Sequence, residues 1–407
     1  MSLNATPSAE RVHIGIFGRR NAGKSSVINA ITNQSLAIVS DVKGTTTDPV
    51  SKAMELLPLG PVMIIDTPGL DDVGELGKMR IQKSYQVLNK TDIAILVIDG
   101  TIGATPEDNA IIERIKEKKI PYIIVLNKLD LAKEKGIDLS LDENSNTMWV
   151  SSVTGENIHE LKELIAKQAP TDDPKLKIVG DLLDPSDFVV LVVPIDKAAP
   201  KGRLILPQQQ TIRDILEANA VSIVVKENEL TNTLENLGKK PKLVITDSQV
   251  FAKVSKDTPE DILLTSFSIL FARYKGDLEE NVKGAKAIET LEDGDTILIS
   301  EGCTHHRQCD DIGRFKIPNW IKNHCKKELN FEFTSGTEFP YDLSKYKMIV
   351  HCGGCTLNTR EMKYRVKCAQ DQNVPITNYG ILIAYIQGIL KRTIEPFPSI
   401  ASVLENK

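Results

Sequence analysis

A glycine-rich loop near the start of the chain constrains the fold more than any other part of the sequence. Residues 18–25 read GRRNAGKS and fit the phosphate-loop pattern G-x-x-x-x-G-K-[ST]. The apolar stretch before the loop is predicted to be a strand, and the stretch after it, SSVINAIT, a helix. Glycines let the backbone curl so that its amides face phosphate oxygens, and the helix adds the positive end of its dipole. The sequence therefore predicts an α/β domain that binds a nucleotide.

The side chains of this loop have distinct expected roles. Lys24 is expected to reach the terminal phosphates, and the Ser25 hydroxyl suits a ligand of Mg²⁺. The nucleotide-binding residues expected from this stretch are Gly18, Arg19, Arg20, Asn21, Ala22, Gly23, Lys24, Ser25 and Ser26.

Two further stretches are expected to complete the site for Mg²⁺ and the γ-phosphate. KGTTTDP, residues 43–49, offers the Thr46 hydroxyl to Mg²⁺. VMIIDTPGL ends a predicted strand at Asp66, from which a carboxylate can hold Mg²⁺ through water. The Gly69 amide would then meet the γ-phosphate, and loss of this contact on hydrolysis would release the loop.

The stretch YIIVLNKLD indicates which base is bound. It ends a predicted buried strand at Asn127, and Lys128 and Asp130 follow. The Asp130 carboxylate can accept two hydrogen bonds from the edge of guanine, where adenine offers no matching pair of donors. A buried carboxylate left unpaired makes the wrong base costly. Taken in order, these motifs predict that the substrate is GTP.

Residues 10–170 resemble the translation-factor-related small GTPases, in particular the branch that contains Era and the tRNA-modifying GTPase MnmE. A fifth motif is expected at VSSVTGEN, with Ser151, Ser152 and Val153 near the base, although Ser152 stands where the family usually has alanine. Ras-type switches have a glutamine after the Asp-x-x-Gly motif to orient the attacking water, and here the residue is Leu70.

The resemblance implies another aid to hydrolysis. Asn21 matches the loop asparagine that helps to bind a monovalent cation in the potassium-activated members of this branch. K⁺ there would stabilise charge in the transition state. The alternative is that Asn21 is only a turn residue; we favour the cation. The catalytic residues expected are therefore Lys24, Asn21 and Gly69.

After a polar linker, QAPTDDPKLK, the pattern changes to a second module. DFVVLVVPID, AVSIVVKE and KLVITDSQV read as strands, and QQQTIRDILEAN between them reads as an amphipathic helix. This alternation predicts a small parallel sheet. Because it lacks a phosphate loop and has a small core, we expect dimerisation as its role, with a simple spacer as the alternative.

The last third of the chain carries all six cysteines, between Cys303 and Cys368. DILLTSFSILFARYKG and NVKGAKAIETL are predicted helices. The predicted strand DTILISEG runs into Cys303 and His305, and YKMIVHCGGC contains His351, Cys352 and Cys355. A thiol–disulfide pair would leave Cys303 and the histidines unexplained. Ligand chemistry alone leaves a zinc site and an iron–sulfur cluster open as equal alternatives.

The whole arrangement resembles the FeFe-hydrogenase maturation GTPases, the HydF family, over essentially the full chain. The resemblance implies a 4Fe–4S cluster on Cys303, Cys352 and Cys355, with His305 or His351 as a fourth ligand or a neighbouring group. It implies a scaffold or carrier for the di-iron precursor of the hydrogenase active site, supplied by radical-SAM maturases and delivered to the immature hydrogenase. The 45 residues between the motifs, 306–350, are about the short limit of the family's range.

We therefore expect an α/β protein with three domains: a GTPase domain (1–170), a dimerisation domain (171–258) and an iron–sulfur domain (259–407). The alternative is a zinc-containing regulatory GTPase that acts on RNA or ribosomes. A net charge of −5 argues against nucleic acid as a partner. The N-terminal stretch lacks the apolar core of a secretory signal, and the longest apolar run, FVVLVVPI, suits a strand. We expect a cytoplasmic homodimer with no membrane partner.

Overall fold

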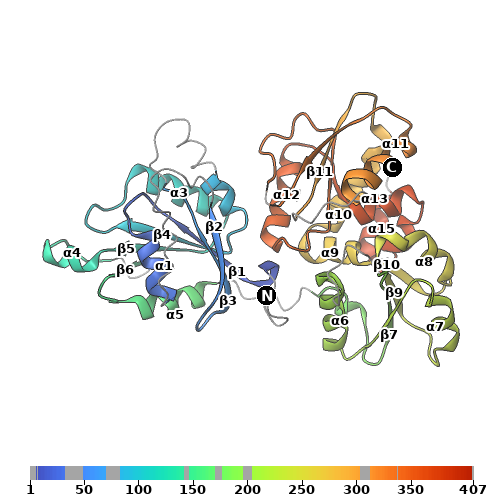
Figure 1. The fold of residues 1–407 in the computed structure, drawn as a ribbon, viewed down its shortest axis with the longest axis horizontal. Helices are drawn as coiled ribbons and strands as arrows, with labels where there is room; N and C mark the ends of the chain where they lie inside the picture. Colours follow the sequence, from blue (N-terminus) through green and yellow to red (C-terminus); the bar gives the residue numbers. More distant parts are fainter. Residues whose placement is uncertain are drawn as a thin grey trace. The chain divides into compact units, whose positions relative to one another are not determined.

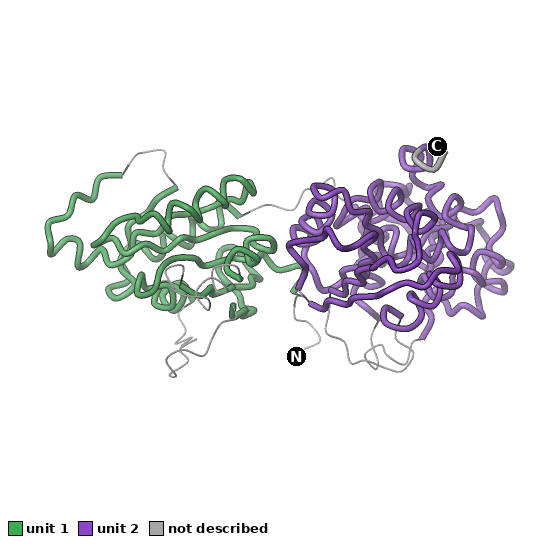
Figure 2. The backbone as a smooth tube through the Cα atoms, turned by 90° about the horizontal axis from the view of Figure 1, so that it is seen from above, with its two compact units in different colours: residues 1–172 green, residues 173–407 purple. Residues whose placement is uncertain are grey.

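The structure is a computed structural model that describes residues 6, 8–32, 49–69, 83–141, 146–169, 177–195, 204–302, 312–336 and 338–405. The chain divides into two compact units, Met1–Asp172 (unit 1) and Asp173–Lys407 (unit 2), which Figure 2 shows in green and purple. Thr46, Leu70, Cys303 and His305 lie outside the described residues.

Unit 1 contains a six-stranded sheet with the strand order β2-β3-β1-β4-β5-β6 (Figure 1). β2 runs antiparallel to β3, and the other neighbouring strands are parallel. The strands are β1 (Val12–Phe17), β2 (Val50–Leu56), β3 (Gly60–Asp66), β4 (Ile93–Asp99), β5 (Tyr122–Asn127) and β6 (Thr147–Trp149). The helices are α1 (Lys24–Thr32), α3 (Pro106–Glu117), α4 (Leu129–Glu134) and α5 (Ile158–Gln168).

Helices cover both faces of this sheet. α1 and α5 pack on one face, where Ile28 and Leu161 are buried with the β1 residue Ile14. α3 packs on the other face, where Ile111 is buried with the β4 residue Leu96. Because successive strand residues point to opposite faces, strands covered on both sides read as continuous apolar runs. The predicted α/β nucleotide-binding domain is confirmed.

The first sheet of unit 2 has the order β10-β9-β7-β8 with all neighbours parallel, which confirms the predicted small parallel sheet. Its strands are β7 (Phe188–Val192), β8 (Val221–Val225), β9 (Leu243–Thr246) and β10 (Leu263–Ser266). The prediction of one helix over DILLTSFSILFARYKG was wrong at its start, because LLTS forms β10 before α9 begins at Phe267. β10 also lies beyond residue 258, where we expected a boundary; the domain limits stay a prediction.

The second sheet of unit 2 has the order β12-β11-β13-β14, again all parallel. Its strands are β11 (Thr296–Ser300), β12 (Asn330–Thr334), β13 (Met348–His351) and β14 (Ile376–Asn378). The helices of unit 2 are α6 (Leu206–Glu217), α7 (Leu230–Asn236), α8 (Phe251–Asp257), α9 (Phe267–Lys275), α10 (Leu278–Ala285), α11 (Ile317–Cys325), α12 (Thr359–Asp371), α13 (Tyr379–Ile386), α14 (Leu390–Ile394) and α15 (Pro398–Glu405).

The two sheets of unit 2 share one apolar core. Leu191 of β7 and Ile299 of β11 belong to the same buried cluster, together with Leu270 of α9, Val282 of α10 and Leu382 of α13. These helices therefore join the sheet predicted for dimerisation to the sheet that carries the cysteine motifs. Within the described residues, no helix combines the length and the apolar character needed to span a bilayer.

Candidate functional site

The phosphate loop lies between β1 and α1, and its two glycines are required by close approaches. Gly18 has φ +141°, and a Cβ there would lie 2.2 Å from the carbonyl oxygen of Val97. Gly23 has φ +94°, and a Cβ there would lie 2.1 Å from Nδ2 of Asn127. Both positions therefore exclude other residues for conformational and steric reasons. The loop has the curled backbone that the sequence predicts for phosphate binding.

Lys24 and Asp66 lie at the mouth of this loop. The Nζ atom of Lys24 donates to the carbonyl oxygens of Gly18 and Arg19, each at 2.9 Å. Asp66 ends β3, and burial raises the pKa of its carboxyl group to about 6, although Lys24 acts in the opposite direction. Its Oδ1 atom is buried and accepts no hydrogen bond from any described residue. An orphaned carboxylate oxygen beside a phosphate site fits a ligand of Mg²⁺ or of its water.

The residues predicted to recognise guanine come together after β5 and β6. Ser151 donates from Oγ to Oδ1 of Asp130 at 2.7 Å, and the Ser152 amide donates to Oδ1 of Asn127 at 3.2 Å. Nδ2 of Asn127 also donates to the carbonyl oxygen of Ala22 at 3.1 Å. The base-recognition motif is thus joined to the phosphate loop on one side and to the fifth motif on the other. Val153, the third predicted residue of that motif, is 84% exposed.

Asp99 is a residue of this site that the sequence analysis missed. It ends β4, and its Oδ2 atom lies 2.5 Å from the Nζ atom of Lys128. The backbone of Lys128 has a φ of 68°. Partial burial acts to raise the pKa of Asp99, but hydrogen bonds from Lys128 and Thr101 outweigh it and hold the pKa below its usual value. The available signal was an acidic residue at the end of the buried run IAILVID, at the same sheet edge as the other motifs.

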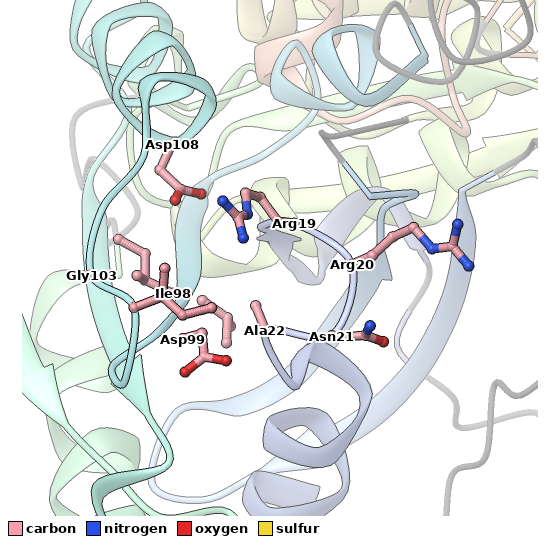
Figure 3. Close-up of a pocket in the computed structure, with 10 residues that line it drawn as sticks. Arg19, Arg20, Asn21, Ala22, Ile98, Asp99, Gly103 and Asp108 are labelled. Atoms are coloured by element: carbon pink, nitrogen blue, oxygen red, sulfur yellow. The ribbon is translucent and has the colours of Figure 1, made fainter. Parts of the chain in front are cut away.

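A pocket of about 340 Å³ opens beside the phosphate loop (Figure 3). Arg19 is directed into this pocket toward Asp108, whereas the guanidinium of Arg20 is directed away from it. The pocket is lined by Arg19, Arg20, Asn21, Ala22, Val97, Ile98, Asp99, Ile102, Gly103 and Asp108.

The cysteine motif begins at the end of β13, next to the end of β11. The Sγ atom of Cys352 accepts hydrogen bonds from the amides of Gly302 at 2.9 Å and Gly354 at 3.4 Å. Gly354 has φ +60°, and a Cβ there would lie 2.4 Å from Sδ of Met362. The turn therefore needs glycine at this position, and it directs two backbone donors at one sulfur. Amide donors of this kind stabilise a thiolate, the form in which cysteine binds a metal.

Cys355 lies three residues after Cys352 in the same turn, and both thiols are half-buried. Burial and the neighbouring Cys352 raise the pKa of its thiol, while Lys275 acts in the opposite direction. Gly302, whose amide donates to Cys352 Sγ, immediately precedes Cys303 in the sequence. Among the described residues no group of three or more His, Cys, Asp or Glu side chains could hold a metal ion. Two thiols with backbone donors, beside the sequence position of a third, fit a metal–sulfur centre.

His351 is buried beneath this turn, with partners at both ring nitrogens. Nδ1 lies 2.6 Å from the carbonyl oxygen of Cys352, and Nε2 lies 2.9 Å from Oδ1 of Asn281. Burial lowers the pKa of His351 to about 4, and the nearby Arg365 acts in the same direction. A neutral imidazole carries a single N–H, so the ring donates to one of these two oxygens at a time. Its burial and its contacts suit a structural support for the cysteine turn.

Three parts of the chain match known protein families. Residues 13–128 match the 50S ribosome-binding GTPase family. Residues 178–276 match the hydrogen maturase F dimerization domain, and residues 279–396 match the hydrogen maturase F tetramerization domain. The two hydrogen maturase F domains together cover more than half of the chain.

Curated relatives resemble the first part of the chain. The tRNA modification GTPase MnmE of Desulforamulus reducens is 40% identical over 121 residues, which are 30% of this chain and 26% of that protein. MnmE of Lactobacillus helveticus is 37% identical over 154 residues, 37% of this chain and 33% of that protein. The chain thus spans about a quarter to a third of the length of these relatives.

A solved structure of Era from Aquifex aeolicus has 20% sequence identity to this chain. The match covers 56% of this chain and 98% of the Era chain, with a TM-score of 0.33.

The expected GTPase domain is confirmed by the family match at residues 13–128 and by the MnmE relatives. The dimerization and tetramerization domains support homo-oligomerisation. The chain belongs to the hydrogen maturase F family, with an N-terminal GTPase domain.

Proposed function

We propose that this chain is a GTPase of hydrogenase maturation that holds a 4Fe–4S cluster and serves as a scaffold or carrier for the di-iron subcluster of the FeFe-hydrogenase active site. It would receive this subcluster from radical-SAM maturases and deliver it to the immature hydrogenase. The observation that carries the proposal is the pair of amide hydrogen bonds to Cys352 Sγ, in a chain that has both hydrogen maturase F domains.

The strand pairing supports a shared ligand set from two loops. β11 and β13 are parallel neighbours, and Ser300 is in register with His351. The loops that follow them therefore leave the same edge of the sheet, where ligand sites of α/β proteins form. Cys352 and Cys355 come from the loop after β13, and Cys303 follows β11 in the sequence. We propose these three thiolates as the cluster ligands, which leaves one iron for a weaker and exchangeable fourth ligand.

In the GTPase domain we propose that Lys24 binds the terminal phosphates and that Ser25, Thr46 and Asp66 hold Mg²⁺ directly or through water. The orphaned Oδ1 atom of Asp66 supports this assignment. Asn127, Lys128 and Asp130 would read guanine, with Ser151, Ser152 and Val153 beside the base. Gly69 would donate its amide to the γ-phosphate, and K⁺ held by Asn21 would stabilise charge in the transition state.

A zinc-containing regulatory GTPase is the competing function, and metal analysis separates the two. The protein is purified without oxygen and reconstituted with iron and sulfide, and its iron, sulfide and zinc are measured beside its electron paramagnetic resonance spectrum. We expect brown protein with about four irons per chain. Cys303→Ala, Cys352→Ala and Cys355→Ala should each lose most of the iron, while GTP hydrolysis persists.

The matched control is Cys368→Ala, because Cys368 is a half-buried thiol on α12 that accepts a hydrogen bond from Gln372. This variant should keep the wild-type iron content. Colourless protein with one tightly bound zinc would refute the cluster and favour the competing function. Equal iron in Cys352→Ala and wild type would refute the ligand set.

A further inference from the structure

Asp108 lies at the third position of α3 and is only 2% exposed. Its Oδ2 atom accepts hydrogen bonds from the Thr105 amide at 3.1 Å and from the Thr105 hydroxyl at 3.0 Å, which caps the start of the helix. Its Oδ1 atom is also buried and accepts no hydrogen bond from any described residue. The cap uses one carboxylate oxygen, and burying the other without a donor is costly. The second oxygen therefore needs a further explanation.

A cation of the phosphate loop faces this oxygen. Asp108 and Arg19 line the same pocket, and Figure 3 shows the Arg19 side chain directed into the pocket toward Asp108. Hydrogen bonds from its own backbone amide and from Thr105 lower the pKa of Glu107, and the charge of Arg19 acts in the same direction. The guanidinium of Arg19 thus lies near the first turn of α3.

The backbone of Arg19 also contacts Lys24. The Arg19 carbonyl oxygen accepts a hydrogen bond from the Nζ atom of Lys24 at 2.9 Å. Because Lys24 is expected to bind the terminal phosphates, a shift of the Arg19 backbone would also shift the ammonium that binds phosphate. α3 is a firm anchor, since its Ile111 and Ile115 are fully buried against the sheet. A contact between Asp108 and Arg19 would therefore fix the phosphate loop to a rigid helix.

We propose that Asp108 is a positioning residue of the phosphate loop. Its Oδ1 atom accepts hydrogen bonds from the guanidinium of Arg19 when GTP is bound, and this ion pair holds the Arg19 carbonyl where it orients Lys24. Arginine is the cation best suited to meet a buried carboxylate, and hydrogen bonds between ionised partners are the strong ones. By linkage, GTP strengthens the pair as much as the pair strengthens GTP binding. This inference rests on the proposed binding of GTP to the phosphate loop.

Four variants of the full chain test this role. Asp108→Asn keeps the size of the side chain and an oxygen for the Thr105 cap, but removes the charge. Arg19→Met keeps an unbranched stem and removes the guanidinium, and a double variant combines the two changes. Glu107→Gln is the matched control, because Glu107 is an exposed neighbour on α3 whose charge also lies near Arg19. Titration with a labelled GTP in Mg²⁺ measures each affinity, and urea unfolding measures each stability.

We expect Asp108→Asn and Arg19→Met each to weaken GTP binding about tenfold. The double variant should bind GTP no more weakly than either single variant, because all three lose the same interaction. Glu107→Gln should bind GTP with the affinity of the wild type. Asp108→Asn should unfold at the same or a higher urea concentration than the wild type, because it no longer buries a charge. A residue that only caps α3 would instead show its loss in urea and leave GTP binding unchanged.

Wild-type GTP affinity in Asp108→Asn would overturn the inference and leave Asp108 as a helix cap. A loss of about a hundredfold in the double variant would also overturn it, because independent effects multiply. So would an equal loss in Glu107→Gln, which would indicate a general effect of charge near the loop. If the wild-type chain does not bind GTP, the proposed nucleotide function fails and this inference falls with it. If the wild type binds GTP and the variants bind it equally well, the proposed function stands and the inference alone is refuted.

Discussion

The Nε2 atom of His351 lies 2.9 Å from Oδ1 of Asn281, which joins the end of β13 to α10 across 70 residues of sequence. The other ring nitrogen, Nδ1, lies 2.6 Å from the carbonyl oxygen of Cys352. Asn281 is fully buried and donates from Nδ2 to the carbonyl oxygen of Asp277, so the amide that meets His351 is itself held in place. The ring thus connects the cysteine turn to a rigid helix.

We predict that His351 supports the turn and is not a ligand of the cluster. Asn281→Ala and His351→Ala should each cost about 1–3 kcal/mol of unfolding free energy, because a buried polar partner is lost. Both substitutions should lower the iron retained after reconstitution. The double variant should lose less unfolding free energy than the sum of the losses in the two single variants. Urea unfolding and iron analysis measure these effects. Loss of a nitrogen coupling from the spectrum of the reduced cluster in His351→Ala, but not in Asn281→Ala, would instead identify His351 as a ligand.

Ser151 should strengthen guanine recognition by orienting Asp130. Removing its hydroxyl in Ser151→Ala leaves Asp130 without the 2.7 Å hydrogen bond and is expected to weaken GTP binding about tenfold, or about 1.4 kcal/mol. Ser152→Ala is the control, because Ser152 contacts Asn127 through its backbone amide, which alanine keeps. Fluorescence titration with a labelled GTP measures both affinities. Equal losses in the two variants would contradict this role of the Ser151 hydroxyl.

Asn21 offers a direct test of potassium activation. Its φ of 59° lies in the left-handed region that asparagine and glycine tolerate, so Asn21→Gly should preserve the backbone while removing the amide oxygen. If the wild type is potassium-activated through this oxygen, its turnover should be severalfold faster in KCl than in NaCl at equal ionic strength. Asn21→Gly should be equally slow in both salts. Equal wild-type rates in the two salts would leave Asn21 as a turn residue.

The buried carboxylate of Asp66 should lower the unfolding free energy of the Mg²⁺-free chain at neutral pH. Burial raises its pKa to about 6, so the folded state binds a proton more tightly than the unfolded state. The stabilising contribution of this group is complete below about pH 4 and is lost as pH rises through 6. Asp66→Asn should therefore raise the unfolding free energy of nucleotide-free chain in EDTA by up to about 3 kcal/mol at pH 7.5, and by much less at pH 4.5.

The same variant should lose Mg²⁺-dependent GTP hydrolysis, because the amide is a poor substitute for a carboxylate ligand. Asp371→Asn serves as the control, since Asp371 is an exposed residue at the end of α12. Urea unfolding at pH 7.5 and pH 4.5 measures the unfolding free energy of wild type and both variants. An Asp66→Asn variant that is less stable than wild type at pH 7.5 would show that the buried carboxylate is not a cost to the fold.

The edge strand β8 should contribute to self-association. It forms one end of its sheet, and Val221 and Val224 are 39% and 44% exposed. An exposed apolar edge strand is a surface that pairs readily with another chain. Val224→Lys should therefore reduce the molecular mass found by analytical ultracentrifugation. Leu131→Lys on α4 is the control in the GTPase domain, because Leu131 is 40% exposed. This variant should keep the molecular mass of the wild type. A wild-type mass for Val224→Lys would exclude β8 from the interface.

Much of the site was predictable because its motifs are local. The phosphate loop is a contiguous stretch between one strand and one helix, and Gly18 and Gly23 have the positive φ angles that a curled loop requires. The helix predicted over DILLTSFSILFARYKG was wrong at its start, where LLTS forms β10, because a short apolar run fits a strand or a buried helix equally well. The missed signal was Ser266, whose hydroxyl accepts from the Ile269 amide and marks where α9 begins.

The amino-acid sequence alone predicts the chemistry that the chain brings to each site: a phosphate loop, a motif expected to read guanine and a clustered set of thiols. These depend on residue type and short spacing, which the chain specifies directly. The distant groups that contact these motifs are set by the packing of the folded chain. Asp99 meets Lys128, Asn281 meets His351, and Lys275 meets the cysteine turn because parallel strands and their helices bring remote segments to the same sheet edge. Burial then sets the strength of the electrostatic interactions and hydrogen bonds between these groups. Burial in turn depends on the packing of the whole fold.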